Sequence, residues 1–139
     1  MPTLRELVEY HRPADIEEAV KLLQRTNVRT VPIAGGTALV PSAARNVEAV
    51  VDLGALGLSY IKTSEVAENL GGLEIGATTT LQMIAEDDRV RDYADGVLVK
   101  AILDTASHNV RDAATIAGSI VAGEGNSPLL TTLLALMRT

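Results

Sequence analysis

The sequence predicts an α+β fold of two small lobes. The spacing of its apolar residues switches repeatedly between a helical period and the alternation of strands, and turn-forming residues separate these segments. A helix and two strands are predicted in the first half, and a hairpin with several helices in the second. We expect the lobes to span residues 1–55 and 56–139, with a joint near residues 54–59.

The first lobe is predicted to begin with a helix after Asp15. The side chain of Asp15 can accept hydrogen bonds from the free amides of the first turn, and Glu18 completes a capping box. One face of this helix is apolar, with the spacing i, i+3, i+4 and i+7. This face consists of Ile16, Ala19, Val20 and Leu23.

Short strands and a hairpin are predicted next. The strands fall at residues 29–34, 49–53 and 60–63. Pro32 makes the first of them an edge or terminal strand, because proline has no amide hydrogen for a sheet ladder. Gly71-Gly72 is predicted as the hairpin turn before a strand at residues 73–77.

The rest of the second lobe is predicted to be mainly helical. Thr79 and Gln82 form a capping-box pair before one helix, and a longer helix follows at residues 95–106. Residues 113–121 are rich in small side chains and are expected to be irregular. Ser127-Pro128 then predicts the start of a last helix. This helix reaches residue 139 without a stop signal, so we expect one part of a larger fold.

The composition argues against several classes of function. The net charge is −6, from 18 acidic and 12 basic residues that form no basic cluster, so nucleic-acid binding is disfavoured. The absence of cysteine excludes disulfides and thiolate metal sites, and two histidines make a zinc site improbable. No apolar run is long enough to span a membrane and no signal peptide is recognisable, so we expect a cytoplasmic protein.

Two segments place bare backbone where a ligand can approach closely. The first, VPIAGGTALV at residues 31–40, puts two glycines at the end of a predicted strand. The second comprises TIAGSI at 115–120 and GEGNSP at 123–128. Amides exposed at such glycines can bind phosphate oxygens, but taken singly an ordinary turn and a capped loop are the simpler interpretations. The P-loop and Rossmann fingerprints are absent.

No catalytic residue and no metal ligand is predicted. The run Glu86-Asp87-Asp88 is expected to face water, and Asp52 either orients a ligand or caps the end of a strand. His108 is expected near a helix C-terminus, where a cation is favoured. No histidine has the context of a Ser-His-Asp triad.

The order of motifs along the chain is more specific than either glycine segment. These motifs are PAxxxEAVxLL at 13–23, PIAGGTALVP at 32–41, VVDL at 50–53, LEIGATTTL at 73–81, VRDAATIAGSI at 110–120 and SPLLTTLLAL at 127–136. Together they resemble the FAD-binding domain of molybdopterin dehydrogenases, the medium subunit of the carbon monoxide dehydrogenase and xanthine dehydrogenase type. The resemblance covers essentially the whole chain.

The resemblance implies a two-lobed flavin-binding fold of the vanillyl-alcohol-oxidase-like (PCMH-type) kind, incomplete at its C-terminus. It implies that the first glycine loop wraps the FAD pyrophosphate and that the second completes the cradle. The implied contacts are Pro32, Ile33, Ala34, Gly35, Gly36, Thr37, Ala38 and Leu39 in the first segment, and Thr115, Ala117, Gly118, Ser119 and Ile120 in the second.

The chain departs from the family pattern in the second segment. Ala117 stands where the family usually has glycine, and Ser119 where it has asparagine. Pro128 takes the place of an aspartate that commonly contacts the FAD ribose, and Glu124 or Ser127 can compensate for it.

The resemblance also implies the function and the partners. Such a domain passes electrons between an iron–sulfur subunit and an external acceptor, and a molybdopterin-binding subunit completes the enzyme. Because this chain has no cysteine, the iron–sulfur cluster must lie on a partner. A homo-oligomer is left open. The alternative is a degenerate or truncated scaffold that no longer binds FAD and serves in subunit assembly.

Overall fold

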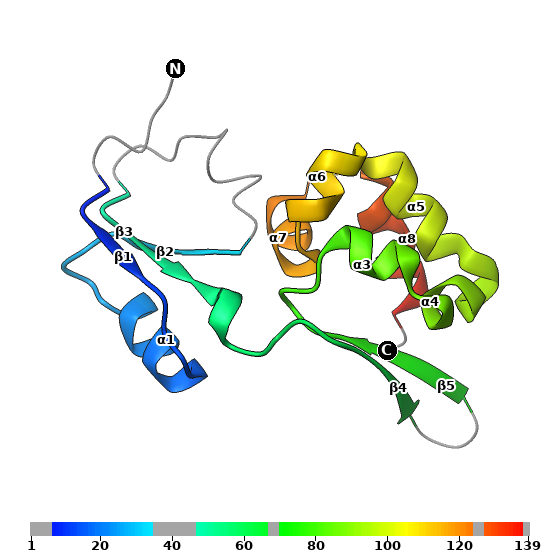
Figure 1. Ribbon diagram of the computed structural model, residues 1–139, viewed down its shortest axis with the longest axis horizontal. Helices are drawn as coiled ribbons and strands as arrows, with labels where there is room; N and C mark the ends of the chain where they lie inside the picture. The colour runs from blue at the N-terminus through cyan, green and yellow to red at the C-terminus, as the bar shows by residue number, and fades with distance from the viewer. Residues whose placement is uncertain (1–6, 35–46, 67–69, 124–126, 138–139) are drawn as a thin grey trace.

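The computed structural model describes residues 7–34, 47–66, 70–123 and 127–137. Figure 1 shows a three-stranded sheet with one helix on one side, and a group of helices with a two-stranded sheet on the other. This mixture of helices and sheets confirms the predicted α+β class. The chain passes between the two parts in the segment that follows the 3-10 helix η1 (Leu53–Ala55). The division into lobes at residue 55 remains a prediction.

The elements follow one another in a mixed order. They are β1 (Glu9–His11), α1 (Ile16–Leu23), β2 (Thr30–Ile33), β3 (Ala49–Asp52), η1, β4 (Ile61–Val66), β5 (Leu70–Ile75), α3 (Leu81–Glu86), α4 (Asp88–Asp92), the 3-10 helix η2 (Tyr93–Gly96), α5 (Val97–Thr105), α6 (His108–Ala113), α7 (Ile116–Ala122) and α8 (Pro128–Leu136). No helix in these described ranges is long and apolar enough to cross a membrane.

The three-stranded sheet is parallel, with the order β1-β3-β2. Its central strand β3 contributes Ala49, Val50 and Val51, all buried, as is typical of a parallel strand covered on both faces. Pro32 lies in β2 at the edge of the sheet, as predicted. Helix α1 packs against β2 and β3 and buries Ala19, but Ile16 and Val20 of its predicted apolar face are exposed.

The helical part has its own apolar core. Helices α3, α4, α5 and α8 contribute most of its buried side chains. The hairpin of β4 and β5 lies against this core through Ile61, Leu73 and Ile75. Two-stranded sheets are marginal by themselves, so the hairpin depends on this contact with the helices. The largest side chains of the core are Leu81, Ile84, Leu98, Ile102, Ile116 and Leu129.

Two helix caps predicted from the sequence are confirmed. The carboxylate of Asp15 accepts a hydrogen bond from the Glu18 amide at 2.8 Å. The hydroxyl of Ser127 accepts one from the Leu130 amide at 3.4 Å. Both side chains satisfy an amide that has no acceptor within its own helix, so local chemistry sets these two boundaries.

Several predictions about the second half are wrong. Gly71-Gly72 is not the hairpin turn: both glycines lie inside β5, where Gly72 pairs with Ser64 and Gly71 with Glu65, and the chain reverses between Val66 and Leu70. Residues 116–122, expected to be irregular, form helix α7, because Thr115 caps a run of small residues that fit a helix. His108 opens helix α6 rather than ending a helix.

The cap of α3 is also one residue away from its predicted position. Thr80, not Thr79, is the N-cap residue, and its hydroxyl accepts from the Met83 amide at 3.2 Å. Thr79 is fully buried and serves another purpose, described below.

The two glycines Gly76 and Gly71 make a matched test of this packing. A Cβ at Gly76 would overlap the carbonyl oxygen of Leu58, whereas a Cβ at Gly71 would meet nothing within 4 Å. We expect Gly76→Ala to lower the free energy of unfolding by about 1–3 kcal/mol or more through overpacking. Gly71→Ala should leave it unchanged or raise it by about 0.5–1 kcal/mol. Urea denaturation measures both, and equal effects would contradict the tight pairing at Gly76.

Candidate functional site

The first predicted segment leaves the carboxyl edge of the parallel sheet. Pro32 is exposed and Ile33 half-buried at the end of β2, and Ile33 pairs with Asp52 at the end of β3. Ala34 follows and is half-buried, whereas Gly35, Gly36, Thr37, Ala38 and Leu39 lie outside the described residues. In open sheets with parallel strands, ligands commonly bind at this edge. Figure 1 shows β2 and β3 running toward the helical part.

Asp52 organises the same edge of the sheet. Its carboxylate accepts hydrogen bonds from the Tyr10 hydroxyl and from the Gly54 amide, the latter at 2.8 Å. Burial raises the pKa of Asp52, but these two hydrogen bonds and the charge of Arg12 outweigh it, so the pKa lies below its usual value. The bond to Asp52 also raises the pKa of the Tyr10 hydroxyl. Of the two roles predicted for Asp52, capping at the strand end is the one observed.

The second predicted segment is the start of helix α7. Thr115 is buried, and its hydroxyl accepts from the Gly118 amide at 3.2 Å as the N-cap of the helix. A Cβ at Gly118 would lie 2.9 Å from this hydroxyl oxygen. The local geometry of this cap thus leaves little room for a Cβ at Gly118. Ser119 is half-buried, Ile120 is 49% exposed, Ser127 caps α8, and Glu124 lies outside the described residues.

The first amides of α7 already have acceptors inside the protein. The Ile116 amide donates to the Thr79 carbonyl at 3.0 Å, and the Ala117 amide donates to the Ala77 carbonyl at 3.1 Å. The Ser119 amide donates to the Thr115 carbonyl at 2.9 Å. With the Gly118 amide on the Thr115 hydroxyl, four successive amides are occupied. This end of the helix therefore offers no free amide between residues 116 and 119 for a phosphate.

Thr79 fixes the position of α7, and sequence analysis missed this role. Its hydroxyl accepts from the Tyr60 amide and donates to the Tyr60 carbonyl, both at 3.0 Å. Its carbonyl holds the Ile116 amide, and the neighbouring residue Thr80 forms an antiparallel bridge with Thr115. The signal in the sequence was the run Thr78-Thr79-Thr80, which contains more hydroxyls than one helix cap uses.

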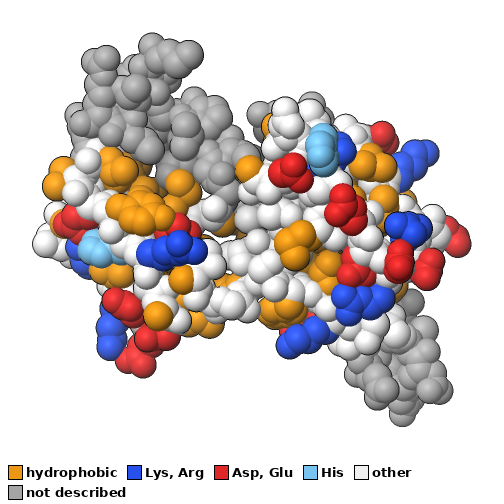
Figure 2. Space-filling model, viewed as in Figure 1, with side chains coloured by type: hydrophobic (Ala, Val, Ile, Leu, Met, Phe, Trp, Pro, Cys, Tyr) orange, Lys and Arg blue, Asp and Glu red, His pale blue; other side chains and the backbone are white. Residues whose placement is uncertain are grey.

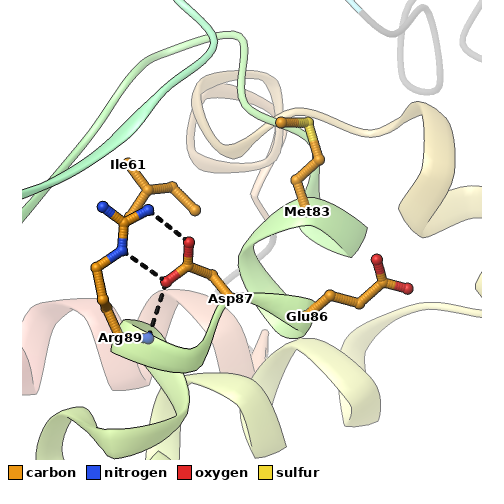
Figure 3. Close-up of a pocket in the computed structure, with 5 residues that line it drawn as sticks. All are labelled: Ile61, Met83, Glu86, Asp87 and Arg89. Carbon is orange, nitrogen blue, oxygen red and sulfur yellow. Dashed lines mark hydrogen bonds and ion pairs between the residues drawn. The ribbon is translucent and has the colours of Figure 1, made fainter.

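A shallow pocket of about 310 Å³ lies between β4, α3 and α4. Figure 3 shows its lining residues, Ile61, Met83, Glu86, Asp87 and Arg89. The Asp87 carboxylate accepts from both Nη2 and Nε of Arg89, at 2.7 and 3.0 Å, and the side-chain hydrogen bond to Arg89 lowers the pKa of Asp87. Asp88 pairs with Arg91 at 2.9 Å. Two carboxylates of the acidic run are thus held by arginines, and the described residues include no cluster of three metal-ligating side chains.

Comparisons with known proteins agree with the motif order. Residues 6–138 match the family described as the FAD binding domain in molybdopterin dehydrogenase. The Escherichia coli K12 protein YgfM is 31% identical over 128 residues, which cover 92% of this chain and 46% of YgfM.

Solved structures show the same likeness. Reconstituted CO dehydrogenase from Oligotropha carboxidovorans superposes with a TM-score of 0.74 and 28% identity, over 87% of this chain and 42% of that one. Quinoline 2-oxidoreductase from Pseudomonas putida 86 gives a TM-score of 0.67 and 29% identity, over 81% and 38%. The chain thus spans about half the length of these relatives, or less.

Thr79→Val tests whether the buried hydroxyl of Thr79 stabilises the fold through its hydrogen bonds and not only through packing. It leaves the amide and carbonyl of Tyr60 without a partner inside the protein, so we expect a loss of about 2 kcal/mol or more in unfolding free energy. Thr79→Ser keeps the hydroxyl and should cost about 1 kcal/mol for the missing methyl group. Denaturation gives both values, and hydrogen exchange at the Ile116 amide should accelerate only in the valine variant. Equal losses in the two variants would contradict the role of the hydroxyl.

Asp52→Asn should make the stability depend less on pH. Because the pKa of Asp52 is lower in the folded protein than in the unfolded chain, its ionised form stabilises the fold above the unfolded pKa. This stabilisation is lost as the pH falls through the folded pKa. We expect a lower urea midpoint than wild type at pH 7, and a difference that closes below about pH 4.

Asp104→Asn is the control, because it removes an exposed carboxylate of α5. A midpoint difference for Asp52→Asn that is the same at pH 7 and pH 3 would contradict the role of the charge.

Proposed function

We propose that this chain, which belongs to the family of FAD-binding domains in molybdopterin dehydrogenases, binds FAD between the carboxyl edge of its parallel sheet and helix α7. FAD is the cofactor of this domain. The observation that carries the proposal is the family match over residues 6–138, together with structural likeness to enzymes of this kind. The two-lobed PCMH-type architecture belongs to the same proposal.

The described residues of α7 suit the flavin ring system of FAD but not its phosphates. Ile120 is 49% and Val121 is 88% exposed on α7, which suits contact with the apolar ring system of a flavin. The amides of residues 116–119 are occupied, so they do not suit its phosphates. We therefore assign the diphosphate to the first segment, Ala34 to Thr37, with Pro32, Ile33, Ala38 and Leu39 beside it.

In this arrangement the electron-transfer chemistry belongs to the flavin. Bound flavin accepts and releases electrons, and the protein supplies binding, orientation and the exclusion of side reactions. No acid or base of this chain is needed for that role. We propose electron transfer between an iron–sulfur subunit and an external acceptor, with molybdopterin on a further subunit, in the cytoplasm. The absence of cysteine supports the placement of the iron–sulfur cluster on a partner.

Two observations favour a second function. The occupied amides of α7 and Pro128 at the first position of α8 remove phosphate and ribose contacts that the resemblance implies. A scaffold that no longer binds FAD and serves in subunit assembly would tolerate both changes. Calorimetric titration of the chain with FAD separates the two functions: saturable binding near micromolar concentration supports the flavoprotein, and no heat of binding supports the scaffold.

Gly36→Asp tests where the diphosphate lies. A carboxylate beside the phosphates should weaken FAD binding by more than about 100-fold, because like charges in contact cost several kcal/mol. Gly71→Asp is the control, because it adds the same charge at an exposed position of strand β5. Flavin fluorescence during titration measures both affinities. If Gly36→Asp binds FAD as wild type does, the first segment does not hold the diphosphate.

A further inference from the structure

Arg12 is a charged residue to which sequence analysis gave no role. We propose that Arg12 binds the diphosphate of the cofactor at the carboxyl edge of the parallel sheet. The inference rests on the proposed binding of FAD and adds a residue outside both glycine segments. It follows from the position of Arg12, from its hydrogen-bond donors, which no described residue binds, and from the charge that the site requires.

The position of Arg12 follows from the register of the sheet. Arg12 directly follows β1, whose last residue His11 pairs with Val51, and it therefore lies beside Asp52 at the end of β3. On the other side of β3, Asp52 pairs with Ile33. Because neighbouring strands are about 4.8 Å apart, the backbone of Arg12 is about 10 Å from the point where β2 continues into Ala34. A long side chain and a diphosphate together can bridge this distance.

Within the described part of the chain, the guanidinium of Arg12 is only loosely held. Its Nε lies 4.0 Å from Oδ2 of Asp52, at the limit of an ion pair, and its side chain is 59% exposed. The carboxylate of Asp52 already accepts from the Tyr10 hydroxyl and the Gly54 amide. Asp52 thus keeps Arg12 near the edge of the sheet without using its donors.

Gly54 leaves room for this arrangement. A Cβ at Gly54 would lie 3.5 Å from Nη2 of Arg12 and 3.0 Å from Oδ1 of Asp52. The guanidinium therefore lies over the bare start of η1, where the chain passes from the sheet to the helical part. Its planar fork of donors matches the geometry of phosphate oxygens.

The site needs a cation that the glycine segments do not supply. A diphosphate is doubly charged, the protein has a net charge of −6, and the first amides of α7 are occupied. Four other described arginines have partners elsewhere: Arg25 with Glu9 and Thr30, Arg111 with Gln82 and the Ala106 carbonyl, Arg89 with Asp87, and Arg91 with Asp88. Arg29 precedes β2 and therefore lies at the opposite edge of the sheet. Figure 2 shows acidic and basic side chains interspersed over the helical part on this face, so no broad basic surface replaces a local cation there.

The test compares FAD with riboflavin, which has the same ring system and no phosphate. We expect Arg12→Gln to weaken FAD binding by about 10- to 100-fold, the usual loss for a charge-assisted hydrogen bond, and to leave riboflavin binding unchanged. Arg12→Lys should lose less, because it keeps the charge without the fork. Flavin fluorescence on titration of the full chain gives all the affinities.

Arg91→Gln is the matched control, because Arg91 is 60% exposed and pairs with one aspartate, Asp88, as Arg12 does with Asp52. It should leave both affinities unchanged. Unchanged FAD affinity in Arg12→Gln, or equal losses for FAD and riboflavin, would overturn the role of Arg12 while the proposed function stands. A wild-type chain that binds no FAD would overturn the proposed function and this inference with it.

Discussion

The structure depends on a short set of backbone hydrogen bonds between residues 77–81 and 114–117. The carbonyls of Ala77 and Thr79 accept the first amides of α7, and the Ala114 carbonyl accepts the Leu81 amide at 2.9 Å. These hydrogen bonds join the start of α7 to the start of α3, and the buried hydroxyl of Thr79 joins both to Tyr60 at the hairpin. One buried threonine thus connects the start of the hairpin with the helix that carries the second predicted segment.

Local chemistry could be predicted from the sequence wherever a residue acts on its near neighbours. Asp15 and Ser127 cap helices because their oxygens reach amides three residues away. Pro32 marks an edge strand because it has no amide to donate. Predictions failed where the deciding partner is distant: β5 takes in Gly71 and Gly72 because β4 pairs with them, and Thr79 is excluded from capping because Tyr60 binds it.

At the candidate site, too, the sequence does not show which partner a residue contacts. The glycine of a motif is ambiguous in a sequence, because a ligand and a neighbouring side chain both require a missing Cβ. At Gly118 the neighbour is the hydroxyl of its own N-cap residue, Thr115. The motif order still identified the family, because it samples the whole chain rather than a single contact. What no local pattern could reveal is that the amides of Ile116 and Ala117 are bound by the distant carbonyls of Thr79 and Ala77.

This use of amides sets a condition on any anionic ligand of the fold. A helix start attracts anions when its amides are free. Here the carbonyls of Ala77 and Thr79, with the carbonyl and hydroxyl of Thr115, already accept hydrogen bonds from these amides. Stability of the helical part and phosphate binding at α7 therefore compete for the same donors. This competition is avoided if the phosphates of the ligand bind instead at the carboxyl ends of the parallel strands. There Asp52 bonds to Tyr10 and Gly54, and among the described residues the guanidinium of Arg12 pairs only with Asp52, at 4.0 Å.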